Sequence, residues 1–106
     1  MINIAEVVDV LIRKHGSAEA DVVDGIDLLV RAGLVIEALS ARQALAAGAM
    51  HARHFDRRTR SVSMADCVVV ALAADVGEPV ASTDRAQLAV AVAEGVAVIE
   101  LAPFSI

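Results

Sequence analysis

The sequence predicts an α/β fold in which helices cover both faces of a parallel sheet. Three short apolar segments have the length and the β-branched content of strands, at 34–39, 79–83 and 96–101. Helical patterns separate these segments, and the strands lack a clean apolar–polar alternation, which is typical of parallel sheets buried on both sides. Hydrophobic residues make up 58% of the 106 residues. This content is enough for one packed domain and excludes a disordered chain.

The first third of the chain predicts two helices. Asn3 followed by Glu6 has the spacing of a capping box, and apolar residues then recur with the period of a helix over 4–15. Ser17 is expected to cap a second helix, which ends just before Gly33. Both helices precede the first expected strand.

Two serines divide the middle of the chain. Ser40 is expected to open an Ala-rich helix that continues to about Arg57, and a basic loop follows over 57–62. Ser63 and Asp66 have capping-box spacing again and begin a helix that extends to residue 76. After the strand at 79–83, a helix over 84–94 leads to the last strand.

Composition excludes several classes of protein. The net charge of −5 argues against a protein that coats nucleic acid without sequence preference. The longest apolar runs, 67–74 and 88–93, are far shorter than the roughly 18–20 residues that a membrane-spanning helix needs. Cys67 is the single cysteine, so no internal disulfide can form, and the first residues do not resemble a signal peptide. We therefore expect a cytoplasmic location and a buried, unreactive thiol at Cys67.

Three acids stand where expected helices begin. Asp84 directly follows a strand, while Glu6 and Asp66 lie in the first turns of two other helices. Helices that follow parallel strands begin at one edge of the sheet, so the three carboxylates are expected to converge there. A hard divalent cation such as Mg²⁺ would offset their repulsion and leave positions open for a phosphate oxygen. Each acid taken singly is equally explained as a helix-capping or first-turn residue.

Four stretches of the chain resemble one known family. They are NIAEVVDVLIR at 3–13, SVSMADCVVVALA at 61–73, GEPVASTDR at 77–85 and EGVAVI at 94–99. In this order they are similar to the PIN domain, and the most similar subgroup is the VapC-type toxin of bacterial toxin–antitoxin pairs. The resemblance runs over nearly the whole chain and is strongest around Asp66 and Asp84.

The resemblance implies a doubly wound α/β fold and a Mg²⁺- or Mn²⁺-dependent endoribonuclease. Glu6, Asp66 and Asp84 would be its catalytic acids and metal ligands, and Thr83 would support the site beside the last acid. RNA would be the substrate, and a cognate antitoxin would block the site.

The sequence departs from the family at its start. PIN domains begin with a strand that ends in an Asp, and here that strand, its acid and the following helices have no counterpart. The fold is therefore expected to be N-terminally truncated, with an unpaired gap in the sheet that favours a homo-oligomer. The alternative to a nuclease is a non-catalytic remnant that binds an antitoxin or self-associates. A phosphoacceptor domain, the third possibility, requires a Lys beyond a late strand, whereas Lys14 lies in the first helix.

One segment concentrates positive charge. It contains four arginines that are candidate contacts for RNA or an antitoxin: Arg53, Arg57, Arg58 and Arg60. The same pattern is typical of a solvated helix end, where cations are favoured. His51 and His54 lie one helical turn apart, and without a further ligand nearby we expect both to be surface residues.

Overall fold

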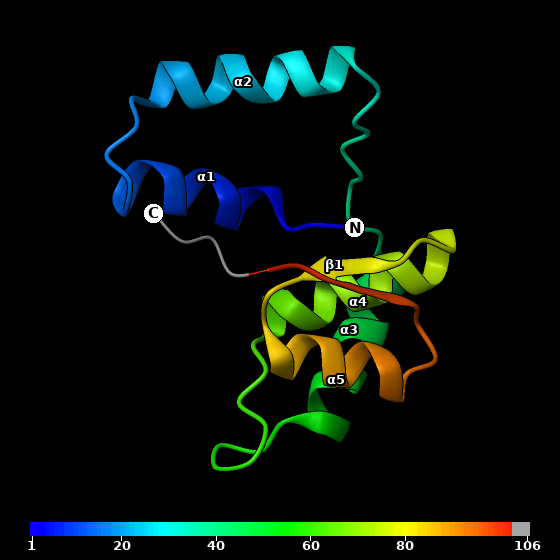
Figure 1. Ribbon diagram of the computed structural model, residues 1–106. Coiled ribbons are helices and arrows are strands. Elements are labelled where there is room, and N and C mark those ends of the chain that lie inside the picture. Colours follow the sequence, from blue (N-terminus) through cyan, green and yellow to red (C-terminus); the bar gives the residue numbers. More distant parts are fainter. Residues whose placement is uncertain (103–106) are drawn as a thin grey trace. The chain divides into compact units, whose positions relative to one another are not determined.

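The computed structural model describes residues 1–102 and divides into two compact units (Figure 1). Unit 1 contains residues 1–2 and the chain from Leu39 onward, and unit 2 contains Asn3–Ala38. The organisation of both units as a single domain stays a prediction.

Unit 2 is a pair of helices, α1 (Ile4–Arg13) and α2 (Glu19–Arg31). Asn3 caps α1 as expected, because its Oδ1 accepts hydrogen bonds from the backbone N–H groups of Ala5 and Glu6 at 3.1 and 3.3 Å. The predicted cap at Ser17 is wrong: α2 begins after Ala18, whose extended backbone ends the preceding loop without any side-chain cap.

The strand predicted at 34–39 does not form. The segment is non-helical and unpaired, and the side chains of Val35 and Ile36 are 72% and 59% exposed. A β-branched composition stabilises a strand only when a neighbouring strand pairs with it and its side chains pack. The described part of unit 2 contains helices and no such neighbour, so the segment remains a connection without regular secondary structure.

Unit 1 begins with two packed helices, α3 (Ala41–His54) and α4 (Met64–Val76). Each starts with a complete capping box, formed by Ser40 with Gln43 and by Ser63 with Asp66. The start of α3 is as predicted, but its end comes three residues before the expected position. Phe55 is extended, with φ of −68° and ψ of 127°, and this backbone conformation stops the helix.

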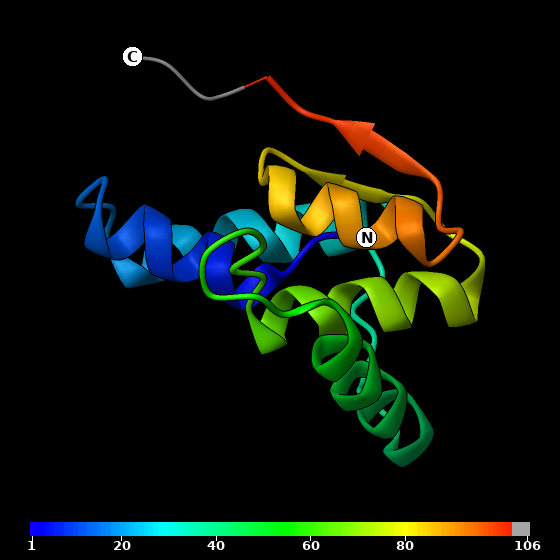
Figure 2. The same cartoon turned by 90° about the horizontal axis from the view of Figure 1, so that it is seen from below.

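A parallel sheet of two strands follows, β1 (Val80–Ser82) and β2 (Val98–Glu100), with Val80 opposite Val98. The crossover helix α5 (Arg85–Ala93) joins them and packs on both strands. The mixed α/β class and the parallel pairing are thus confirmed. In Figures 1 and 2, α3, α4 and α5 lie on the same side of the strands. A helical layer on the other face stays a prediction.

The core of unit 1 lies between this sheet and its helices. Its largest fully buried side chains are small and come from the loop before α4, from α4, from β1 and from α5: Val62, Cys67, Val70, Val80 and Val90. With aromatic residues at 2% of the chain, the layers pack through valine and alanine. Close packing of small side chains brings the beginnings of α4 and α5 near each other, as the polar contacts described below show.

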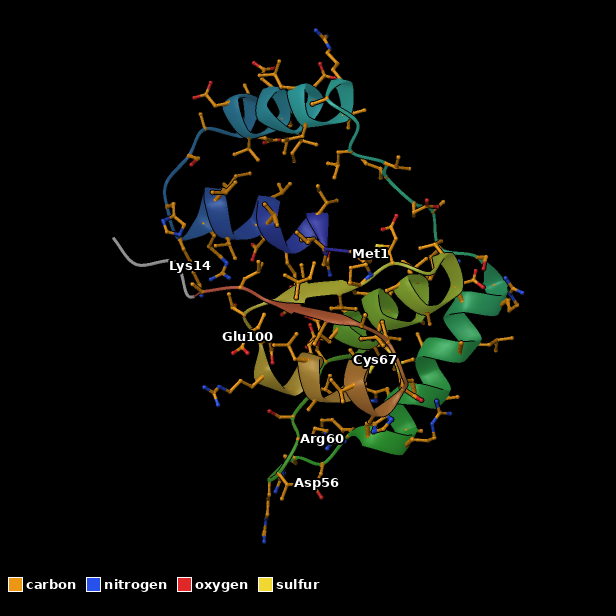
Figure 3. All side chains as sticks on the ribbon, turned by 45° about the vertical axis from the view of Figure 1, so that its right-hand side comes forward. Met1, Lys14, Asp56, Arg60, Cys67 and Glu100 are labelled. Atoms are coloured by element: carbon orange, nitrogen blue, oxygen red, sulfur yellow. The ribbon has the colours of Figure 1, made fainter. Side chains whose placement is uncertain are left out.

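Residue Met1 pairs with β1 on the edge opposite β2. Its amino group donates to the carbonyl of Pro79 at 2.7 Å, and its own carbonyl accepts from the N–H of Ala81 at 3.3 Å. Met1 thus bonds to Pro79 and Ala81, the residues on either side of Val80, which is the hydrogen-bond pattern of a parallel strand. The edge of β1 that was expected to be unpaired is therefore partly hydrogen-bonded, and Figure 3 shows Met1 beside this strand.

Replacing Ser63 with Ala removes the hydroxyl that accepts from the backbone N–H of Asp66 at 3.1 Å. We expect the free energy of unfolding to fall by about 1 kcal/mol, the usual cost of losing an N-cap side chain. Urea denaturation followed by circular dichroism measures this change. The control is Ser61→Ala, at an exposed position of the preceding loop. Equal stabilities of the two variants would contradict the capping role.

Candidate functional site

Asp66 is held at the start of α4 with one carboxylate oxygen engaged. It is the third residue of the helix, and its Oδ2 accepts from the backbone N–H of Ser63 at 3.2 Å. The residue is 8% exposed. Among residues 1–102, no hydrogen bond reaches Oδ1, so this oxygen is available to a ligand.

Asp84 is the N-cap of α5. Its Oδ1 accepts from the backbone N–H groups of Ala86 and Gln87 at 2.8 and 3.2 Å, and its own N–H donates to Oγ of Ser82 at 2.9 Å. The residue is exposed, and Oδ2 receives no hydrogen bond within the described chain. Like Asp66, Asp84 uses one oxygen to cap a helix and leaves the other for a ligand.

Gln87 connects these two helix starts. Its backbone N–H donates to the Asp84 carboxylate, and its side-chain Nε2 donates to the backbone carbonyl of Asp66 at 3.4 Å. The side chain is buried, with the residue 6% exposed. Gln87 was not among the residues that sequence reasoning singled out. The structure therefore brings together the first turns of α4 and α5, with both acids, through a residue that carries no charge.

Thr83 and Glu6 complete the residues predicted for the site. Thr83 is exposed, and the hydroxyl that contacts Asp84 belongs to Ser82. Glu6 is an exposed residue in the first turn of α1, within unit 2. Within residues 1–102, no three His, Cys, Asp or Glu side chains form a group that could hold a metal ion. The convergence of all three acids and the supporting role of Thr83 stay predictions.

The donor set in unit 1 fits a hard divalent cation in its chemistry. Asp66 and Asp84 offer carboxylate oxygens, which are the ligands that Mg²⁺ and Mn²⁺ prefer. Both stand at helix N-termini, Asp66 in the first turn of α4 and Asp84 as the N-cap of α5. A Mg²⁺ ion is commonly held by one or two carboxylates with water in its other positions. Two available oxygens on adjacent helix starts can therefore form part of such a site.

The four arginines of the basic segment differ in their partners. Arg53 forms an ion pair with Glu94, and Arg60 lies 3.1 Å from Nδ1 of His54. Arg57 and Arg58 are exposed, and among residues 1–102 their side chains form no ion pair or hydrogen bond. Of these four arginines, Arg57 and Arg58 can contact another molecule without breaking a contact among the described residues.

His54 was expected at the surface, and this expectation is wrong. Its side chain is 15% exposed, with Nε2 at 3.3 Å from Oε1 of Glu94. The atoms are within ion-pair distance, but their alignment does not make a hydrogen bond, so Nε2 is buried without one. The ring is enclosed because Glu94, which follows α5, and Arg60, in the loop after α3, both extend to it. His51, by contrast, stacks on Phe55 with ring centroids 4.9 Å apart.

Cys67 is fully buried beside Asp66, and Figure 3 shows it inside the core. Burial raises the pKa of its thiol, and the negative charges of Asp66 and Glu94 raise it further. The thiolate is the reactive form of cysteine, and here it is disfavoured. The expectation of a buried thiol is confirmed, and that it is unreactive stays a prediction.

A shallow pocket of unit 1 lies at the opposite end of the strands from Asp84. Its walls include Gly77 and Glu78 after α4, and Glu94 and Gly95 after α5. Neither Asp66 nor Asp84 lines it. The candidate site is therefore a surface formed by two helix starts, rather than this pocket.

Comparison with known proteins gives one match. A family model described as the PIN domain matches residues 1–93, which is most of the chain. No curated protein and no solved structure matches. None of the helices within residues 1–102 is both long and apolar enough to cross a membrane.

Replacing Gln87 with Met keeps the length of the side chain and removes its amide. The backbone carbonyl of Asp66 then loses its buried donor, and we expect stability to fall by about 1 kcal/mol. Thermal or urea unfolding measures the loss. Arg85→Met, in the same turn of α5 but exposed, is the control and should leave stability within about 0.5 kcal/mol of the wild type. A Gln87→Met protein as stable as this control would show that the bond does not join the two helices.

The ion pair of Glu94 predicts a dependence of stability on pH. The hydrogen bond from Arg53 is the main cause that lowers the pKa of Glu94 below its ordinary value of 4.5. A lowered pKa in the folded state stabilises the fold above pH 4.5, and this contribution is lost as the pH falls through the folded-state value. The stability of the wild type should therefore fall more steeply below pH 4.5 than that of Glu94→Gln. Parallel slopes in urea titrations across this range would contradict the assignment.

Proposed function

Because the chain belongs to the PIN domain family, a family of nucleases that often depend on metal ions, we propose that it is a metal-dependent endoribonuclease of the VapC toxin type. The reaction is hydrolysis of RNA phosphodiester bonds with a Mg²⁺ or Mn²⁺ ion. The toxin assignment rests on the resemblance of the motifs around Asp66 and Asp84.

One observation carries the proposal. The residues that match the family's acids, Asp66 and Asp84, start two adjacent helices that Gln87 joins. Each carboxylate is fixed by its capping hydrogen bonds and keeps one oxygen for a ligand. Acids that served only as caps would not need to lie at neighbouring helix starts on the same side of the core.

Glu6 is the third ligand in this proposal. Its support is the family resemblance, because Glu6 lies in the stretch at 3–13 that is similar to the PIN domain. Asn3 caps α1, and Glu6 follows in its first turn. The proposal requires α1 to carry this carboxylate to the edge where Asp66 and Asp84 stand.

The residues of the chain have separate tasks in the reaction. Glu6, Asp66 and Asp84 bind and orient the ion through carboxylate oxygens. When bound, such an ion would supply positive charge that stabilises the charge developing on the phosphate. The capping bonds of Ser63 to Asp66, and of the α5 backbone to Asp84, prevent the ligands from rotating. Pre-positioned ligands lower the cost of organising the site when RNA binds.

The proposal extends to partners and location. A VapC-type toxin has a cognate antitoxin that occupies the acidic site, and we include that partner and self-association in the proposal. The single, buried Cys67 is consistent with a reducing cytoplasm. The mass of the protein in solution tests self-association directly.

Replacing Asp66 or Asp84 with Asn tests the metal site without removing the caps. Asn is about as good an N-cap as Asp at position 84, and at position 66 its side-chain oxygen can still accept from the N–H of Ser63, so the fold should persist while the charge is lost. We expect the rate of cleavage of single-stranded RNA in Mg²⁺ to fall by more than about 100-fold, because even residues behind metal ligands contribute about 10–100-fold. Binding of Mn²⁺, measured by calorimetry or electron paramagnetic resonance, should weaken in parallel.

Asp27→Asn provides the matched control. It removes one negative charge from a surface ion pair with Arg31 and should leave both cleavage and Mn²⁺ binding unchanged. Cleavage that survives Asp66→Asn and Asp84→Asn would refute the site. A wild-type protein that binds no Mn²⁺ and cleaves no RNA would favour the non-catalytic alternative.

A further inference from the structure

The loop after α3 contains a short hairpin turn with a well-defined base. Asp56 and Arg60 form an antiparallel bridge, with the N–H of Asp56 bonded to the Arg60 carbonyl at 2.8 Å and the reverse bond at 2.9 Å. Figure 3 labels both residues at the base of this turn. Three residues, 57–59, form its tip. The basic loop predicted at 57–62 therefore begins with a turn that a backbone bridge closes.

The side chain of Asp56 closes the turn from inside. Its Oδ1 accepts from the backbone N–H groups of Arg58 and Thr59 at 2.8 and 3.0 Å. These backbone bonds, that of Thr59 first, lower the pKa of the Asp56 carboxyl, so it stays ionised under ordinary conditions. The carboxylate of Asp56 accepts hydrogen bonds from the backbone, and within the described chain it forms no ion pair with the arginines beside it. The turn therefore presents positive charge outward.

Of the four arginines in this segment, Arg53 and Arg60 are occupied, and Arg57 and Arg58 at the tip are available. Arg53 pairs with Glu94, and Arg60 contacts His54 and belongs to the bridge. Arg57 and Arg58 are exposed at the tip, without a partner among residues 1–102. Two adjacent guanidinium groups on a turn held at its base are suited to bind anionic groups spaced along a chain.

We propose that Arg57 and Arg58, presented by the 56–60 turn, bind backbone phosphates of the RNA substrate. This inference rests on the proposed nuclease function. The acids of the site and the net charge of −5 repel a polyanion, so binding of RNA needs local cations. The turn belongs to unit 1, as do Asp66 and Asp84, and the same loop continues into Ser63 at the start of α4. The pair supplies affinity without reading bases, as phosphate contacts do.

The experiment compares Arg57→Gln/Arg58→Gln with Arg31→Gln/Arg42→Gln in the full chain. Both double variants change the net charge from −5 to −7, since each removes two positive charges. Arg31 and Arg42 are ion-paired at the surface with Asp27 and Asp75, so they are the matched control. Fluorescence anisotropy with a labelled single-stranded RNA, in EDTA to prevent cleavage, gives the dissociation constant at several salt concentrations.

For the tip variant we expect the slope of log K against log salt to shrink by about 1.4, because each neutralised phosphate of a single strand contributes about 0.7 to that slope. Wild-type binding should then weaken about 7-fold more than that of the tip variant when salt rises from about 50 to 200 mM. The control variant should keep the wild-type slope. Matching melting temperatures show that any difference is not a folding defect.

The outcomes separate this inference from the proposed function. A tip variant with the wild-type slope, or a wild-type protein that does not bind RNA, overturns the inference. If the tip variant instead loses affinity for polyglutamate and not for RNA, the turn binds an acidic protein and the inference is wrong. A wild-type protein that binds RNA through the tip but does not cleave it in Mg²⁺ supports the inference and refutes the nuclease.

Discussion

The arrangement of the candidate site depends on the buried amide of Gln87. This side chain spans from the first turn of α5 to the backbone of Asp66 in the first turn of α4. The carbonyl of Asp66 lies within a helix start that is itself closed by Ser63. One uncharged residue therefore connects two acidic helix starts, where a direct contact between the acids would be repulsive.

Capping and ligand binding by the acids are compatible because a carboxylate has two oxygens. In Asp66 and Asp84, one oxygen accepts backbone N–H groups and the other is left without a hydrogen bond among the described residues. The capping bonds fix the side-chain rotamers before any ion binds, which reduces the entropy lost on binding. The explanation of Asp66 and Asp84 as helix-start residues is thus correct, and the same hydrogen bonds orient their remaining oxygens.

Sequence reasoning succeeded where the determining interactions are local. The caps at Asn3, Ser40 and Ser63 each depend on residues two or three positions away, and all are formed. The strand at 34–39 failed because pairing depends on a distant partner that composition does not reveal. Gln87 was missed for the same reason, since its side-chain bond reaches 21 positions back along the chain and polar residues in a first turn are common. Glu94 and His54 come from separate elements too, so spacing alone gave no signal that the histidine would be enclosed.

Net charge is a poor guide to what this protein can bind, because the fold decides which charges remain available. Arg13, Arg31 and Arg42 are each paired with a carboxylate at 2.8 to 2.9 Å, and Arg53 is paired with Glu94. Within the hairpin turn, the carboxylate of Asp56 accepts hydrogen bonds from backbone N–H groups and forms no ion pair with the neighbouring arginines among the described residues. An acidic chain therefore still presents two adjacent cations at one place. At physiological salt, charges act over about 8 Å, so a polyanion near the turn responds to those cations more than to the total of −5.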